Sequence, residues 1–149
     1  MNAKAQDALA ILKLHEIRSE ALMREARSWF MSEFTPHSGK EIVTLLLSGQ
    51  KQSAYYRMVA SHWEMASALV SNGGIDEKMF LEAHTEHLAV FAKLQPFIAE
   101  VREIIGEPDY LSYLEQLVMR TPNVEKKLEN RRRLLERWAQ AQAVVEAQA

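Results

Sequence analysis

Residues 52–71 read QSAYYRMVASHWEMASALVS, and this stretch decides the fold class. It contains no glycine or proline, and its apolar side chains recur at the pitch of an α-helix, about 100° per residue. The apolar arc covers about half of the helix, so we expect this helix to contact at least two neighbouring helices. Asn72, Gly73 and Gly74 then end it.

The chain before this stretch predicts two further helices. Residues 3–34 contain no glycine or proline and carry an apolar arc, so we expect a single long helix there. Ser38 and Glu41 have the spacing of a capping box, in which the serine side chain binds a free backbone N–H of the first turn. They predict a short helix that runs through Leu47 and ends before Gly49, a residue that tolerates left-handed backbone.

The chain after this stretch predicts three more helices. Asp76 is a good N-cap, and the apolar stripe that follows stays in phase as far as residue 105, so we expect one helix with a kink at Pro96. Residues 109–120 predict a short helix. Thr121 and Pro122 predict the start of a last long helix, with a frayed tail after about residue 144.

The expected fold is therefore all-α: a bundle of about six helices, four long and packed roughly antiparallel, and two short. A length of 149 residues suits one domain with a sizeable core, so we expect a single domain over residues 1–149.

Composition excludes several classes of protein. The chain has no cysteine, which excludes disulfides and thiolate chemistry, and its net charge of −2 gives no bulk attraction to polyanions. No apolar run approaches the roughly 18 residues that span a bilayer. The first residues are polar, unlike a signal peptide, so we expect a cytoplasmic protein.

The middle of the chain resembles a known family. His62-Trp63-Glu64, Gly73-Gly74-Ile75-Asp76 and Pro96-Phe97-Ile98 with Arg102 follow one another at set distances. This order, over roughly residues 60–117, resembles an uncharacterised bacterial helical family known only as a domain of unknown function. The resemblance implies a helical fold, and it supplies no catalytic residue, cofactor or partner.

Four of the five histidines lie on the apolar arcs of the expected helices, namely His15, His62, His84 and His87. Imidazoles that converge inside a bundle can hold a metal ion or haem, and the spacing His84-x-x-His87 suits a chelating pair. The alternative is that these are partly buried rings, each satisfied by one hydrogen bond. Glu-x-x-His and His-Glu-x-x-His are absent, so we expect no cofactor and keep the metal or haem site as the alternative.

The last helix is locally basic. Residues 125–137 hold six basic and three acidic side chains, a net charge of +3. Arg131, Arg132 and Arg133 could contact nucleic acid, but three consecutive residues spread widely around a helix. The alternative is a solvated face with internal ion pairs, such as Glu129 with Arg133.

Sequence patterns thus favour a non-enzymatic protein-interaction or scaffold module. The chain has no glycine-rich phosphate loop and no Gly-x-Ser-x-Gly, although a site scattered over a bundle would leave no motif. We also expect a homodimer, because the long apolar arc with Trp29, Phe30 and Phe34 exceeds what a chain of this size covers. The alternatives are the histidine site and nucleic-acid contact by the basic helix.

Overall fold

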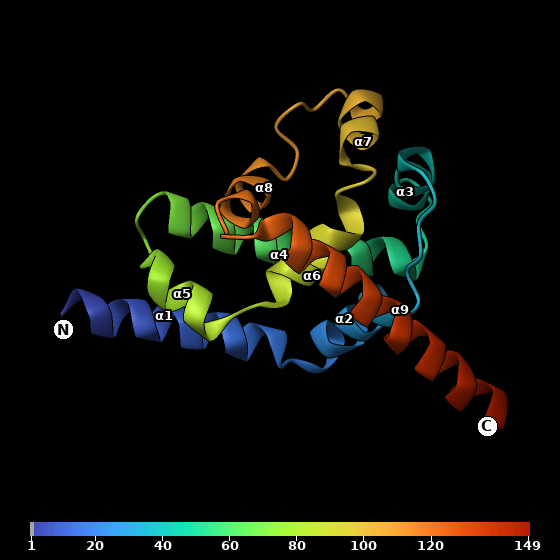
Figure 1. The fold of residues 1–149 in the computed structure, drawn as a ribbon, viewed down its shortest axis with the longest axis horizontal. Helices are drawn as coiled ribbons and strands as arrows, with labels where there is room; N and C mark the ends of the chain where they lie inside the picture. The colour runs from blue at the N-terminus through green and yellow to red at the C-terminus, as the bar shows by residue number, and fades with distance from the viewer. Residues whose placement is uncertain (1) are drawn as a thin grey trace.

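A computed structural model of the chain describes residues 2–149 (Figure 1). That part of the chain forms nine helices and no strand. The helices are α1 (Ala3–Arg18), α2 (Ala21–Ser32), α3 (Gly39–Leu46), α4 (Lys51–Ser71), α5 (Glu77–Ala83), α6 (Glu86–Leu94), α7 (Ile98–Ile105), α8 (Ser112–Met119) and α9 (Val124–Gln148). The all-α prediction is confirmed, and the prediction of about six helices is wrong.

The three additional helices arise because two expected helices are broken. Helices α4 and α9 have 21 and 25 residues, and no other helix of residues 2–149 exceeds the 16 residues of α1, so four long antiparallel helices do not form. The first break separates α1 from α2. The Ser19 hydroxyl donates to the His15 carbonyl (2.9 Å), and Glu20 adopts extended backbone with φ −64° and ψ 145°. A serine hydroxyl that binds a helix carbonyl in this way competes with the helix's own hydrogen bonds. Because of the bend, the apolar faces of α1 and α2 both pack into the same core.

The predicted helix over residues 77–105 is divided into α5, α6 and α7. His84 has extended backbone (φ −134°, ψ 137°), and α6 begins again after Thr85. At the second break, Pro96 has no N–H to donate to the Ala92 carbonyl four residues earlier. The Arg132 Nε of α9 donates to that carbonyl instead (3.0 Å). A kink becomes a break because a distant side chain replaces the missing helical hydrogen bond.

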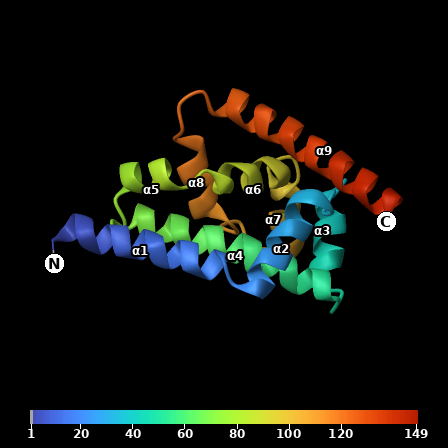
Figure 2. The same cartoon turned by 90° about the horizontal axis from the view of Figure 1, so that it is seen from below.

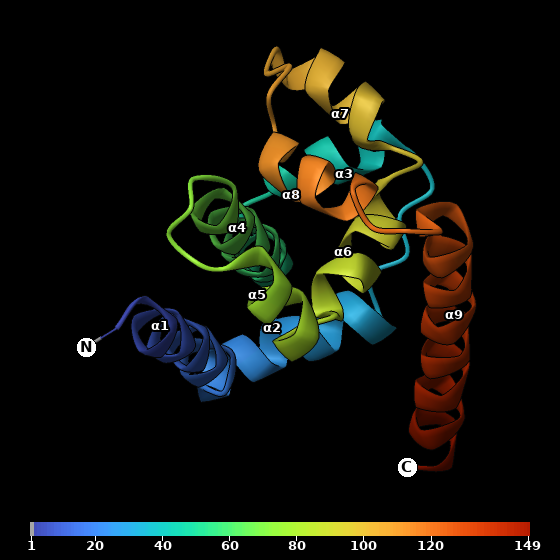
Figure 3. The same ribbon diagram turned by 60° about the vertical axis from the view of Figure 1, so that its left-hand side comes forward.

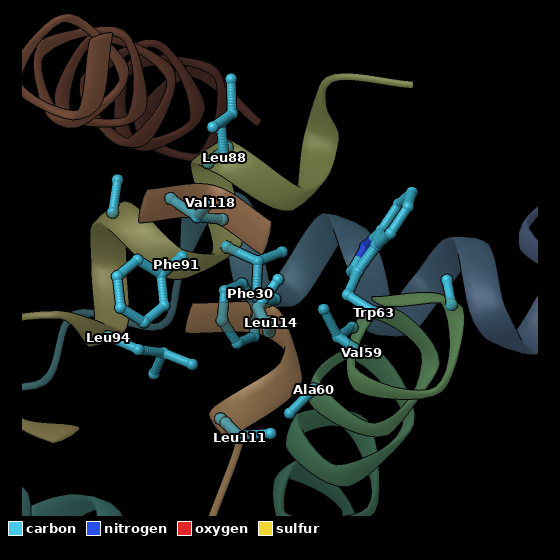
Figure 4. Packing of buried hydrophobic residues seen from close by; sticks show 14 of the residues in the cluster. Phe30, Val59, Ala60, Trp63, Leu88, Phe91, Leu94, Leu111, Leu114 and Val118 are labelled. Carbon is cyan, nitrogen blue, oxygen red and sulfur yellow. The ribbon is translucent and has the colours of Figure 1, made fainter. Parts of the chain in front are cut away.

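Helix α6 lies at the centre of the molecule, between α4 and α9 (Figures 2 and 3). All of its residues from His87 to Leu94 are buried except Lys93. Around it, Phe30 of α2, Val59 of α4 and Leu114 of α8 point toward one another and form the core (Figure 4). Its apolar run thus packs on several helices at once, as expected for a central helix.

The partly buried Lys93 of α6 caps the C-terminal end of α2. Its ammonium donates to the backbone carbonyls of Phe30 (2.6 Å) and Phe34, which lie at and just beyond the end of α2. The last carbonyls of a helix have no partner within it and carry partial negative charge, so a cation there is stabilising. Burial lowers the pKa of Lys93 to about 8.

Several predicted helix ends are confirmed. The Ser38 side chain accepts from the Glu41 N–H (3.0 Å), and that of Asp76 accepts from the Met79 N–H (2.8 Å). The starts of the last two helices were placed two or three residues too early. Leu111 and Asn123 precede α8 and α9 with positive φ of 57° and 56°, and Asn123, rather than Thr121, is the N-cap of α9.

The second half of α9 extends away from the rest of the molecule (Figures 1 and 3). Leu128 and Leu135 of its first half are buried, whereas Trp138 is 48% exposed and Val145 is 61% exposed. Helix α9 continues to Gln148 in the structure, and fraying of its end in solution remains a prediction. Among residues 2–149, no helix is both long and apolar enough to cross a membrane.

The role of Arg132 can be measured by urea unfolding. We expect Arg132→Met to lower the free energy of unfolding by about 1–2 kcal/mol, because the Ala92 carbonyl loses its donor. Arg133→Met on the next position is the control; its side chain is exposed and pairs only with Glu129, so the expected cost is below about 0.5 kcal/mol. Equal costs for the two variants would contradict this role of Arg132.

Candidate functional site

Three of the four predicted histidines meet around one buried tryptophan. The ring of Trp63 on α4 lies 4.8 Å from that of His62, 5.6 Å from that of His84 and 6.0 Å from that of His87, measured between centroids. Phe80 of α5 completes the cluster at 6.3 Å. The prediction that the histidines face inward is therefore confirmed for these three.

His15, by contrast, is exposed on α1, where its Nδ1 lies 3.4 Å from the Arg18 guanidinium. The continuous first helix of the prediction placed His15 on an apolar arc. The true core face of α1 carries Ile11 and Leu14.

The clustered imidazoles are buried without hydrogen-bond partners. Both nitrogens of His84 and of His87, and Nε2 of His62, have none among residues 2–149. Burial lowers the pKa of His62 and of His87 to about 4, and it also lowers the pKa of His84, where nearby Arg18 adds to the effect. The Ile11 carbonyl acts on His84 in the opposite direction, although neither ring nitrogen reaches it with hydrogen-bond geometry. These rings are therefore neutral at pH 7.

The geometry around Trp63 is that of an aromatic cluster. Within residues 2–149, no three His, Asp or Glu side chains are arranged so that they could hold a metal ion. The metal or haem hypothesis for His15, His62, His84 and His87 therefore stays a prediction.

Beside this cluster, the Glu86 carboxylate joins four helices. Arg27 of α2 donates to it from Nε (3.1 Å) and Nη2 (2.8 Å), and the Trp63 indole N–H of α4 donates to it at 3.1 Å. Arg18 of α1 contributes a guanidinium nitrogen at 3.4 Å. Only 16% of the Glu86 side chain is exposed. Burial raises the pKa of Glu86, but Arg27, Arg18 and Trp63 outweigh that effect and hold it below its ordinary value.

Two hollows that share lining residues lie next to Glu86. A groove of about 480 Å³ runs between α2 and the second half of α9, and a pocket of about 240 Å³ lies between α1, the turn from α5 to α6, and α9. Met31, Glu86 and Trp138 line both. Arg24 and Arg27 line the groove, and Arg18 and Arg131 line the pocket, so positive charge gathers around one carboxylate.

The three arginines proposed for nucleic-acid contact have three different environments. Arg131 lines the pocket, Arg132 donates to the Ala92 carbonyl and the Gln95 side chain, and Arg133 pairs with Glu129 at 3.6 Å. They form no shared surface, and two of them have partners within the protein. Nucleic-acid contact by Arg131, Arg132 and Arg133 stays a prediction.

The residues that carried the family resemblance hold the ends of helices. Glu64 accepts the Leu114 N–H (2.7 Å) and so caps α8 from a distance. Arg102 donates to the Tyr110 carbonyl (2.8 Å) and pairs with Glu115 (3.1 Å) across the loop between α7 and α8. These residues therefore hold the ends of neighbouring helices and the loop between α7 and α8 in place.

A family model described as a domain of unknown function (DUF4760) matches residues 3–121. The chain belongs to this family. The predicted resemblance to an uncharacterised helical family is thus confirmed, and the match is longer than the stretch that suggested it. Neither the curated proteins nor the solved structures include a match to the chain. The matched DUF4760 range supplies Arg18, Arg27, His84 and Glu86, while α9 lies beyond it and supplies Arg131 and Trp138.

Sequence reasoning missed Glu86, Arg18 and Arg27 as site residues. A continuous helix over residues 77–105 keeps Glu86 on a flank, and only the break at His84 turns its carboxylate toward Trp63. The sequence does contain one hint, since Glu86 stands between two histidines that are themselves on an apolar stripe.

Removal of the Glu86 charge is expected to destabilise the fold. In Glu86→Gln, the Arg18 and Arg27 guanidinium groups lose their counter-charge in a mostly buried position, at a cost of about 2–4 kcal/mol of unfolding free energy. The matched control is Glu82→Gln, whose exposed pair with Lys78 predicts a change below about 0.5 kcal/mol. Similar losses of unfolding free energy in the two variants would contradict the stabilising role of Glu86.

The clustered imidazoles predict a loss of stability in acid. Because the folded pKa of His62 and of His87 is about 4, below the ordinary 6.5, the unfolded chain takes up protons first as the pH falls. The contribution of these rings is complete above about pH 6.5 and is lost between about pH 6.5 and 4, by a few kcal/mol in all. Urea unfolding at several pH values measures this change.

A His87→Leu variant is expected to show a smaller acid-induced loss than the parent. The control is His37→Gln, because the His37 side chain is exposed in a loop beside the Glu41 carboxylate, 3.5 Å away, and its backbone N–H donates to the same carboxylate. If the acid-induced loss is unchanged in His87→Leu, the buried imidazoles are not its cause.

Proposed function

We propose that this chain is a non-enzymatic protein-interaction module whose docking surface is the groove between α2, which lies within the DUF4760 range, and α9, which lies beyond it. The proposed occupant is an acidic amphipathic helix of a partner protein. The observation that carries the proposal is the contrast between the two walls of the groove. The α2 wall is cationic, and the α9 wall is mostly apolar, as the lining residues show: Arg24, Arg27, Ser28, Met31 and Ser32 on α2, and Trp138, Ala141, Gln142 and Val145 on α9.

The apolar wall continues a buried seam of α9. Leu128, Leu135, Trp138 and Val145 follow one another at spacings of seven and three residues, which keeps them on one face of a helix. The first two are buried in the core and the last two are exposed at the groove. A partner helix laid along this face would extend the packing that the core begins, and this is how amphipathic helices bind hydrophobic grooves.

The charge of the groove favours an acidic partner. Among residues 2–149, the charged side chains that line the groove are Arg24, Arg27 and Glu86, a net charge of +1. Arg18 and Arg131 of the adjoining pocket raise the net charge of the two hollows together to +3, on a chain whose net charge is −2. Within residues 2–149, Arg24 and Arg131 form no ion pair. Electrostatic complementarity of this kind selects a partner and accelerates its association.

Binding can be tested with a synthetic helix. A fluorescein-labelled peptide with leucines on one face and glutamates on the others is titrated with the protein, and anisotropy is measured. We expect binding that weakens with salt, and at least a tenfold loss of affinity in Trp138→Ala, because an exposed tryptophan in a groove is a typical hot spot. The same peptide with lysines in place of glutamates should bind at least tenfold more weakly.

The control variant is Leu12→Ala, which removes a side chain that is 61% exposed on α1 and does not line the groove. If it reduces binding as much as Trp138→Ala, the groove is not the docking surface. Light scattering tests the predicted homodimer as the other occupant. A particle of twice 17.1 kDa that Trp138→Ala returns to one chain would place a second copy in the groove and would contradict an acidic partner.

A further inference from the structure

The pocket of about 240 Å³ differs from the groove in having polar groups on several sides. Arg18 of α1, His84 and Thr85 of the turn before α6, and Arg131 of α9 all line it. Arg18 Nε and both nitrogens of His84 are buried and have no hydrogen-bond partner in the part of the chain that the structure describes. His84 is only 4% exposed. The Arg18 Nε–H and the one N–H of a neutral His84 are therefore buried donors without a partner. Such donors are costly, so this arrangement points to a ligand that accepts hydrogen bonds.

We propose that this pocket binds a phosphate group, either as inorganic phosphate or as part of a small phosphorylated molecule. The inference goes beyond the proposed function and does not depend on it, because it requires no peptide and no partner protein.

The charge balance of the pocket favours an anion. Glu86 is the acidic side chain that lines it, and its oxygens already accept from Arg27 and Trp63. Arg18 shares that single carboxylate with Arg27 and has only a 3.4 Å contact with it, while Arg131 has no ion pair within residues 2–149. Arg18 also lies over the Trp63 ring, with its Cζ 5.3 Å from the ring centroid, and its Nε has no acceptor among residues 2–149. Arg18 Nε and the Arg131 guanidinium can therefore donate to a second anion.

The backbone N–H groups at the pocket also favour an anion. Thr85 and Glu86, which line the pocket, form the N-terminus of α6, and Thr85 makes no side-chain cap. The first N–H groups of a helix have no partner within it and lie at the positive end of its dipole. Phosphate groups bind such helix starts when further donors surround them.

His84 adds a donor that is not itself charged. It faces Arg18 and His15 of α1, Glu86 of α6 and the ring of Trp63, and burial with the Arg18 charge favours its neutral form. The Ile11 carbonyl of α1 acts in the opposite direction, but it makes no hydrogen bond to either ring nitrogen. A neutral imidazole still presents one N–H. Donors from α1, from the start of α6 and from α9 approach from different sides, which suits a tetrahedral oxyanion better than a planar carboxylate.

Titration calorimetry and thermal unfolding test this inference with two probes, sodium phosphate and glycerol 3-phosphate, with sodium chloride at equal ionic strength as the reference. We expect phosphate to bind and to raise the melting temperature, and chloride to do neither, because a ligand that binds only the folded state stabilises it. Tighter binding of glycerol 3-phosphate would identify a phosphorylated molecule as the source of the group, and tighter binding of inorganic phosphate would identify the free ion.

The matched variants are Arg131→Gln and Arg133→Gln, which remove the same charge from neighbouring positions of α9. Arg131 lines the pocket and Arg133 is exposed beside Glu129, so we expect at least a tenfold loss of phosphate affinity in the first and less than a twofold change in the second. Circular dichroism of each variant without phosphate checks that it folds. If Arg131→Gln does not fold, Arg131→Lys replaces it, since lysine keeps the charge but loses the two-pronged contact.

Two results would overturn the inference. One is a phosphate effect no larger than that of chloride at equal ionic strength. The other is an equal loss of affinity in the variants at positions 131 and 133, which would mean general screening of the basic helix. Both results are independent of peptide binding, so failure of the pocket and failure of the groove are distinguishable.

Discussion

The Glu86 carboxylate is the interaction on which the arrangement of the helices depends. This carboxylate accepts hydrogen bonds from Arg27 of α2 and Trp63 of α4 and forms an ion pair with Arg18 of α1. Glu86 is the first residue of α6, so the carboxylate links α6 to these three helices. These helices contact one another mainly through apolar side chains, which pack well in more than one register. A buried carboxylate with directional donors has far fewer acceptable positions. Together with Lys93, which ends α2, it fixes how α6 lies against the N-terminal helices.

The elements that were predicted correctly are those whose causes are local. The helix around Trp63 was predicted almost to the residue, because glycine residues end it and its apolar arc is wide. The caps at Ser38 and Asp76 were predicted because both the side chain and its N–H partner lie within three residues. The inward position of His62 and His87 follows from helical pitch, whereas His84 is buried although its extended backbone interrupts the predicted helix.

The features that were missed have causes distant in sequence. No residue near Pro96 in the sequence indicates that Arg132 donates to the Ala92 carbonyl. That contact allows the predicted helix to break fully between α6 and α7. The bend at Glu20 has no glycine or proline to mark it. The site was missed for the same reason, since Arg18, Glu86 and Arg131 lie on three different helices and line one pocket only in the folded chain. A pattern read along one helix shows which way each side chain faces, but not which helix it faces.

The second half of α9 forms one wall of the groove, but few contacts with the other helices hold this segment in place. Its last turns have few buried side chains, and free energies of local opening are small in such segments. The surface is therefore complete only in the fraction of molecules in which these turns are helical, and the apparent affinity of any occupant is reduced by that fraction. An occupant that contacts Val145 would in return make the end of α9 more helical, so recognition and helix formation are a single equilibrium.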